Sequence, residues 1–225
     1  MDDRLPSFDK RACARDLASD AARLPRAERT HLAVRFRSAP WERILPALSP
    51  HGALCDVGCG PGVLAYLLAR YGFTGTYLGL DPDERKVARA KEWPGGTPSR
   101  RFEKGSVEAA PEGAFDQVVV VDVLYLVAVE EREAFLRRAA SALQAKGRLV
   151  VVTSGGGPPW KRLLDRMQER VAVSLLGLTR GASVAPCDGR EIAVLMNAVG
   201  LAGVSIVPIG SGYLHGFELV TGTKP

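Results

Sequence analysis

The stretch ALCDVGCGPG, residues 53–62, decides the fold of this chain. Its first half is a short apolar run that predicts a strand, and its second half is a turn rich in glycine. The leucines of residues 63–71 share one face, which predicts a helix directly after the turn. Gly58 and Gly60 allow positive φ and a close approach of the backbone to a ligand. The start of the helix favours an anionic or polar ligand group, and Asp56 closes the strand with a carboxylate that we expect in the same crevice.

Size and composition indicate one globular domain. The chain has 225 residues, of which 46% are hydrophobic and 24% charged. It contains no apolar run of about 18 residues, and its first residues, MDDRLPSFDKRACARDL, have no apolar signal core, so we expect a cytoplasmic protein. The cysteines are scattered and fit a reducing compartment; no pair has the spacing of a metal site. They are Cys13, Cys55, Cys59 and Cys187.

The net charge of +5 is mild, and the basic residues are spread along the chain. A basic protein can bind RNA, anionic lipid or an acidic small molecule. Without a basic block, nucleic-acid binding is the less favoured alternative.

Strands and helices alternate after an N-terminal helical cap at residues 1–50. Helices are predicted at 8–24, 27–38, 41–48, 63–71, 84–93 and 130–143, and strands at 75–81, 101–106, 115–122 and 148–153. This order predicts an α/β fold, a doubly wound Rossmann-like sheet over residues 51–225 that binds ligands at the carboxyl ends of its strands. Polar residues fall at these strand ends, namely Asp56, Asp81, Ser106, Asp122 and Ser154.

The C-terminal part predicts a reversed strand. A helix at 190–199 precedes strands at 203–209 and 217–223, which bring the sheet to seven strands. The loop at 210–216 is too short for a crossover, so these two strands form an antiparallel hairpin. If the strand at 203–209 runs parallel to the others, the loop emerges at the ligand-binding edge. Tyr213 and His215 would then face the site.

Residues 155–187 form a segment additional to the minimal strand–helix repeat. Trp160 begins an apolar series at helical spacing, and basic residues occupy the opposite face. Because this helix follows a strand that ends at the site, we interpret it as a lid; ordinary packing against the sheet is the alternative. Its apolar end also allows peripheral membrane or lipid contact through residues 160–178.

The glycine turn and four later segments resemble class I S-adenosylmethionine (SAM) dependent methyltransferases of the small-molecule type. The third glycine of a nicotinamide-type G-x-G-x-x-G turn would stand at Val63, which counts against an oxidoreductase. The matching segments, in the order of the family, are DVGCGPG, YLGLD, FEKGSVEAAP, FDQVVVVDVLYLV and LQAKGRLVVVT.

The resemblance implies SAM as the cofactor. It assigns the methionine part of SAM to the turn around Gly58 and Gly60, and the two ribose hydroxyls to Asp81. Ser106 stands where the family commonly has an aspartate at the adenine amino group. The cofactor residues implied are Asp56, Gly58, Cys59, Gly60, Asp81, Pro82, Ser106, Val107, Asp122 and Val123.

The methyl acceptor is expected to be a small and hydrophobic molecule. The segment DVLY lacks the Asn/Asp-Pro-Pro-aromatic signature of many amino-methylating relatives, which favours O- or C-methylation of a natural product, quinone or lipid-like compound. Tyr125 and His215 are candidate catalytic residues, and a general base helps only where the acceptor carries a proton. Tyr125, Trp160, Tyr213 and His215 are candidate acceptor contacts. A non-catalytic SAM-binding accessory protein and an RNA-directed methyltransferase remain alternatives.

Overall fold

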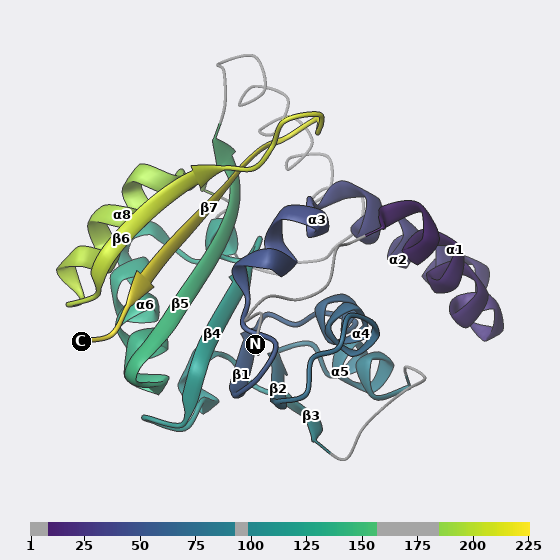
Figure 1. The fold of residues 1–225 in the computed structure, drawn as a ribbon, viewed down its shortest axis with the longest axis horizontal. Helices are drawn as coiled ribbons and strands as arrows, with labels where there is room; N and C mark the ends of the chain where they lie inside the picture. Colours follow the sequence, from purple (N-terminus) through teal and green to yellow (C-terminus); the bar gives the residue numbers. More distant parts are fainter. Residues whose placement is uncertain (1–8, 93–98, 157–184) are drawn as a thin grey trace.

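The computed structural model describes residues 9–92, 99–156 and 185–225 (Figure 1). Three helices open the chain: α1 (Lys10–Asp20), α2 (Arg26–Ser38) and α3 (Trp41–Ile44). The central helices are α4 (Val63–Arg70), α5 (Glu84–Lys91) and α6 (Arg132–Ala142), and α8 (Gly189–Ala198) follows later. The strands are β1 (Ala53–Val57), β2 (Thr76–Asp81), β3 (Arg100–Lys104), β4 (Phe115–Val121), β5 (Leu143–Gly156), β6 (Ala202–Pro208) and β7 (Gly216–Thr223).

The strands form one seven-stranded sheet in the order β3-β2-β1-β4-β5-β7-β6. The first five strands are parallel, and β7 is antiparallel to both β5 and β6. The predicted reversed strand is therefore confirmed. It is last in the sequence but lies between β5 and β6, where Phe217 and Val220 become buried, and β6 takes the edge of the sheet.

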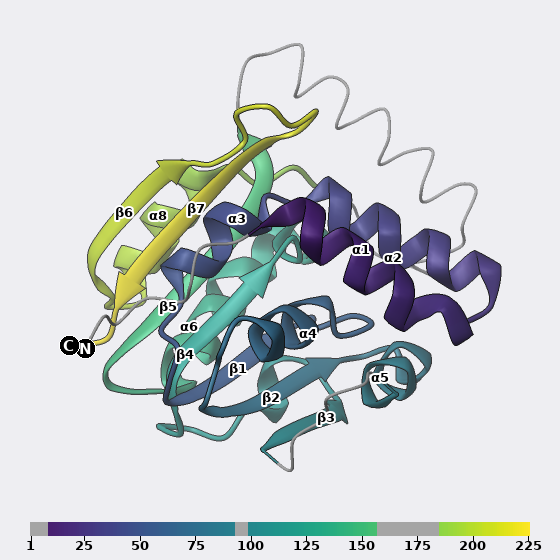
Figure 2. The same ribbon diagram turned by 45° about the vertical axis from the view of Figure 1, so that its right-hand side comes forward.

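Helices cover both faces of the sheet (Figure 2). Val119 and Val121 of β4 belong to the apolar core shared with α1, α2 and α4, whereas Val118 and Val120 belong to the core shared with α6 and α8. A strand buried on both faces needs apolar side chains at every position. This requirement explains the uninterrupted valine run of β4.

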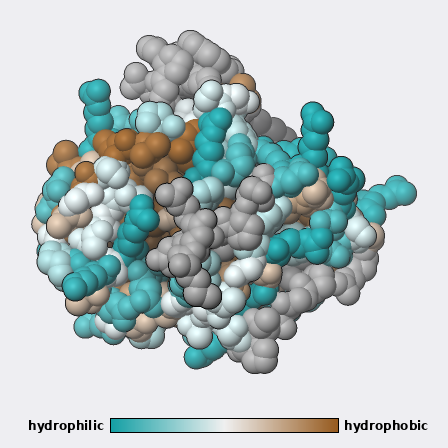
Figure 3. Space-filling model, in the orientation of Figure 1, coloured by the Kyte–Doolittle hydropathy of each residue, from teal (hydrophilic) through white to brown (hydrophobic). Residues whose placement is uncertain are grey.

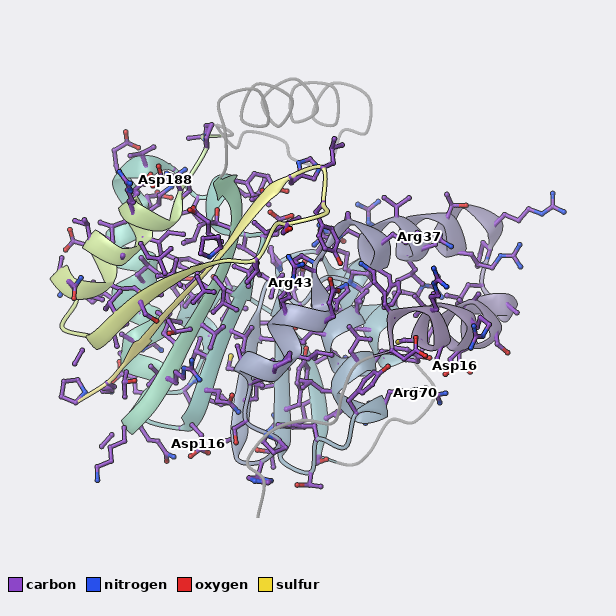
Figure 4. The ribbon with its side chains drawn as sticks, turned by 45° about the horizontal axis from the view of Figure 1, so that its top comes forward. Asp16, Arg37, Arg43, Arg70, Asp116 and Asp188 are labelled. Atoms are coloured by element: carbon purple, nitrogen blue, oxygen red, sulfur yellow. The ribbon has the colours of Figure 1, made fainter. Side chains whose placement is uncertain are left out.

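The N-terminal helices pack against α4. Pro25 separates α1 from α2, and Tyr66 on α4 donates a hydrogen bond to Asp20 Oδ2 at 2.8 Å. Asp16 on α1 also forms an ion pair with Arg70 at the end of α4 (Figure 4).

Strand β5 is longer than predicted. It runs from Leu143 to Gly156 and passes Lys146, which has φ +64°, before its regular pairing with β4 begins at Arg148. Ser154 therefore lies within the strand rather than just after it. Of the predicted lid at 155–187, residues 157–184 lie outside the described residues, as does the predicted lipid-contacting segment at 160–178.

The edge strand β6 carries exposed apolar side chains. Ile206 is 38% exposed and Val207 48% exposed, and Figure 3 shows a hydrophobic area over this part of the sheet. Among the described residues, no helix is long and apolar enough to cross a membrane.

Candidate functional site

The glycine turn after β1 is held against the neighbouring strand. The N–H groups of Gly58 and Cys59 both donate to the carbonyl of Leu80, at 2.7 and 2.9 Å. Gly58 has φ +80°, and a Cβ atom built there would overlap Val123 Cγ2. Only glycine satisfies both constraints, because its backbone adopts positive φ without strain and it has no side chain.

Gly60 faces open space. It has φ +54°, and a Cβ atom built on it would meet nothing within 4 Å. Its N–H donates to Asp81 Oδ2 at 2.9 Å. Gly62, with φ +82°, is the N-cap residue of α4, so the positive end of the helix dipole lies beside this space. The turn thus forms an open cradle next to a carboxylate and a helix N-terminus.

Asp81 lies at the end of β2 and is 4% exposed. Its Oδ1 accepts the N–H of Asp83 at 2.9 Å, so each of its oxygens accepts one backbone hydrogen bond. A carboxylate oxygen can accept two, so both can also bind a ligand hydroxyl. Pro82, the next residue, is exposed.

Strand β3 ends beside Asp81, where the N–H of Gly105 donates to the Asp81 carbonyl at 3.1 Å. Ser106 follows; it is exposed and its hydroxyl contacts Glu108. Val107 is 1% exposed and begins a short 3₁₀ helix. The structure therefore brings the predicted ribose and adenine residues to one edge of the sheet.

Asp56, whose carboxylate was expected in the crevice, is a buried residue. It is 2% exposed, and the Tyr77 hydroxyl donates to its Oδ2 at 2.5 Å. The register explains this position, because Asp56 lies opposite Gly79 and Tyr77 stands two residues earlier on the same face of the sheet. Burial raises the pKa of Asp56 to about 7, although the Tyr77 hydrogen bond lowers it.

Cys59 lies under the same turn as a buried side chain. A Cβ atom on Gly79 would crowd Cys59 Sγ at 3.0 Å, so glycine on β2 makes room for it. Burial raises the pKa of the Cys59 thiol, as expected for a packing residue rather than a nucleophile.

Asp122, at the tip of β4, connects three parts of the molecule. It has φ +57°, and its N–H donates to the Val152 carbonyl at 2.9 Å. Ser154 on β5 donates to its Oδ1 at 3.0 Å, and Arg35 on α2 lies 3.4 Å from its Oδ2. A basic residue of the N-terminal cap thus reaches the ligand edge of the sheet.

Tyr125 stands in the short helical turn Leu124–Leu126 that follows Asp122 and is half-buried. Its carbonyl accepts the N–H of Ala185 at 3.1 Å. The chain therefore returns beside Tyr125 at residue 185. Trp160 lies outside the described residues and stays a prediction.

The loop between β6 and β7 is attached to the cap. The Tyr213 hydroxyl lies 2.6 and 2.8 Å from the two carboxylate oxygens of Glu42 and also contacts Lys10, whose Nζ is 4.3 Å from the centre of the tyrosine ring. Arg43, on α3 of the cap, donates to the Ile209 carbonyl at 2.6 Å (Figure 4). Burial raises the pKa of Tyr213 and lowers that of Lys10. The Tyr213 hydroxyl thus joins the loop to the cap.

His215 lies further along the same loop. It is half-buried, and its ring packs edge-on against Phe217 with the centroids 6.0 Å apart.

A family profile described as "Methyltransferase domain" matches residues 29–206, most of the chain and all the strand ends above. The chain belongs to the methyltransferase domain family. Its fold is that of the class I SAM-dependent methyltransferases, and SAM is the cofactor of these enzymes.

The curated relatives of this methyltransferase domain are O-methyltransferases. The chain is 31% identical over 150 residues to "Ubiquinone biosynthesis O-methyltransferase" of Paracidovorax citrulli, covering 65% of this chain and 58% of that protein. It is 34% identical over 135 residues to "Acetylserotonin O-methyltransferase" of Mus musculus, covering 54% of this chain and 35% of that protein. The chain therefore spans only about half the length of the curated relatives it matches.

Solved structures agree with the fold of this methyltransferase domain. The apo structure of the S-adenosylmethionine-dependent methyltransferase SibL superposes with a TM-score of 0.68 at 18% identity, covering 93% of this chain and 62% of that one. A possible histamine N-methyltransferase from Thermotoga maritima superposes with a TM-score of 0.61 at 20% identity, covering 93% of this chain and 100% of that one.

Two buried residues with contacts near these strand ends were not predicted from the sequence. Tyr77 donates a hydrogen bond to Asp56. The available signal in the sequence was its spacing, because Tyr77, Gly79 and Asp81 alternate along β2 and so share one face of the sheet. Arg132, the first residue of α6, is fully buried. Its signal was helical spacing, because it stands four residues before the buried Leu136.

Proposed function

We propose that this protein transfers a methyl group from SAM to a hydroxyl group of a small acceptor with an apolar body. The single observation that carries the proposal is the open space over Gly60, beside the Asp81 carboxylate and the start of α4. The two relatives described above are both O-methyltransferases by name, which supports oxygen as the methylated atom.

The residues present fit this cofactor. Asp81 would accept the ribose hydroxyls, and Ser106, Val107 and Pro82 would lie near the adenine. The space over Gly60 leaves room for the methionine part. Arg35 and Asp122 carry opposite charges at the same edge, which suits the carboxylate and the ammonium of an amino acid.

Bound SAM supplies an electrophilic methyl group whose leaving group departs neutral, so the protein mainly positions the acceptor. Holding the reacting atoms at near-attack distance can contribute roughly 7–11 kcal/mol. A hydroxyl acceptor also loses a proton, and the half-buried His215 would take it. Tyr125, at the tip of β4, would contact the acceptor.

The cofactor assignment is tested by calorimetry with S-adenosylhomocysteine. We expect Asp81→Ala to weaken binding at least tenfold, because a hydrogen bond to a charged group contributes about 1.5–3 kcal/mol. The matched control is Asp83→Ala, two residues away, where the carboxylate caps α5. Equal affinity of the two variants would contradict the ribose assignment.

The acceptor assignment is tested with methyl-labelled SAM and three related probes: 1,2-dihydroxybenzene with an apolar tail, its dimethoxy counterpart and the corresponding diamine. We expect label only in the dihydroxy compound, with a lower kcat and unchanged S-adenosylhomocysteine affinity for His215→Ala. Label in the dimethoxy compound would indicate methylation of carbon, and label in the diamine would indicate a nitrogen acceptor.

A further inference from the structure

Arg132 is a fully buried cation outside the residues discussed for the cofactor. Its exposed fraction is 0%, and every nitrogen of its guanidinium has a partner. Nε donates to the Val127 carbonyl at 3.3 Å, and Nη2 donates to the Ala185 carbonyl. Nη1 donates to the Pro186 carbonyl at 3.2 Å and to Glu191 Oε1 at 2.6 Å.

These partners come from two segments that are far apart in the sequence. Val127 ends the turn that carries Tyr125, next to Asp122 at the tip of β4. Ala185 and Pro186 belong to the chain that returns to the sheet before α8. The Ala185 N–H donates to the Tyr125 carbonyl, so the two segments also contact each other directly.

The returning chain has a second anchor on the sheet. Thr153 on β5 donates through Oγ1 to the Cys187 carbonyl at 2.5 Å. Asp188 then caps α8 by accepting the N–H of Glu191 at 2.9 Å. The guanidinium therefore adds a side-chain link between this anchored chain and the Tyr125 turn, beside the backbone hydrogen bond from Ala185 to Tyr125.

An arginine is suited to this task and other residues are not. Its planar fork donates in fixed directions, whereas a lysine is a flexible point charge. An apolar residue of similar length would leave the carbonyls of Val127, Ala185 and Pro186 without this donor. Because only Glu191 among these partners carries a charge, the ion pair alone does not account for the arrangement.

The groups that Arg132 holds lie on one side of the site. Its hydrogen-bond partners named above include neither the glycine turn nor the carboxylates of Asp81 and Asp122, which carry the cofactor assignments. This separation predicts an effect on the acceptor without an effect on the cofactor.

We propose that Arg132 is a positioning residue for the methyl acceptor, because it fixes the Tyr125 turn and the returning chain at 185–187 as one wall of the acceptor site. This inference rests on the proposed methyl transfer. It assigns specificity for the acceptor to a residue that contacts neither substrate.

The test compares Arg132→Met and Arg132→Lys with Arg137→Met, an exposed arginine of the same helix that pairs with Glu133. Hydrogen exchange is measured for peptides covering residues 122–128, 185–192 and 53–60. For Arg132→Met we expect about tenfold faster exchange in the first two peptides and no change in the third. Unchanged exchange at 122–128 overturns the proposal, whether or not the protein is a methyltransferase.

The kinetic arm uses 1,2-dihydroxybenzene with an apolar tail as the acceptor and S-adenosylhomocysteine as the cofactor probe. We expect the acceptor KM to rise about tenfold in Arg132→Met and less in Arg132→Lys, with the S-adenosylhomocysteine Kd within about twofold of wild type. A parallel loss of both affinities would indicate a general structural role and overturn the proposal.

The comparison also covers a variant that does not fold and a wild type that methylates none of the probes. If Arg132→Met does not fold, Arg132→Lys carries the same comparison, because lysine keeps the positive charge but lacks the planar fork that reaches several carbonyls. If the wild type binds S-adenosylhomocysteine but methylates none of the probes, the acceptor assignment fails while the exchange measurements still decide the positioning role.

Discussion

Replacing Asp56 with asparagine should make the protein more stable, and by an amount that depends on pH. The buried carboxyl has a pKa of about 7, against an ordinary value of 3.8. Between these values the folded state holds a proton that the unfolded chain has released, so the free energy of unfolding falls as pH rises. A pKa shift of about three units corresponds to roughly 4 kcal/mol in the free energy of unfolding. This contribution is lost in full above pH 7.

Asparagine has the same shape, stays neutral and can still accept the Tyr77 hydroxyl. We therefore expect Asp56→Asn to match wild type near pH 4 and to exceed its stability near pH 8 by up to about 4 kcal/mol. Urea unfolding followed by circular dichroism at both pH values measures the difference. Asp83→Asn is the control with the opposite sign, because hydrogen bonds from Arg85 lower the pKa of Asp83 and its stabilisation is lost at low pH. A gain for Asp56→Asn that is equal at both pH values would refute the reasoning.

Three further predictions concern the turn and the cap. Gly58→Ala should destabilise the protein by roughly 2–5 kcal/mol in urea unfolding, from positive φ together with the overlap with Val123, whereas Gly60→Ala should cost only about 1–2 kcal/mol. Calorimetry should show that Gly60→Ala binds S-adenosylhomocysteine more weakly than wild type. Equal losses of stability in Gly58→Ala and Gly60→Ala would contradict the geometry of the turn. Tyr213→Phe should cost about 1.5–3 kcal/mol, because it removes the bond to Glu42, and exchange in the hairpin loop should accelerate. Arg35→Gln should change stability by less than about 1 kcal/mol but weaken S-adenosylhomocysteine binding about tenfold. Arg37→Gln on the same helix is its control, and equal binding by both would remove Arg35 from the site.

The order of elements could be predicted from the sequence because it depends on local patterns. The valine run of β4 indicates a strand buried on both faces, and the short loop before β7 indicates an antiparallel hairpin. Each pattern is contained within a few residues. The strand-end positions of Asp81 and Asp122 follow from the same patterns.

The contacts that complete the site could not be predicted, because they depend on register and on distant segments. Tyr77 reaches Asp56 only because β1 and β2 pair with Gly79 opposite the carboxyl. Arg35 and Asp122 are 87 residues apart in sequence, and no periodicity relates a helix of the cap to a strand tip. The same holds for Lys10 and Tyr213, which are 203 residues apart.

Two of the contacts that the N-terminal cap makes with the ligand edge and the β6–β7 loop differ in strength. Arg35 and Asp122 are 40% and 20% exposed at 3.4 Å, so solvent screens their attraction and the pair contributes little to stability. At the other place Tyr213, Glu42 and Lys10 form a half-buried cluster, in which hydrogen bonds to charged groups are worth more. A zwitterionic ligand that reaches Asp122 must compete with Arg35 for it, and can itself pair with Arg35. We therefore expect ligand binding to exchange partners at the weak junction, while the Tyr213 cluster keeps the cap attached to the β6–β7 loop.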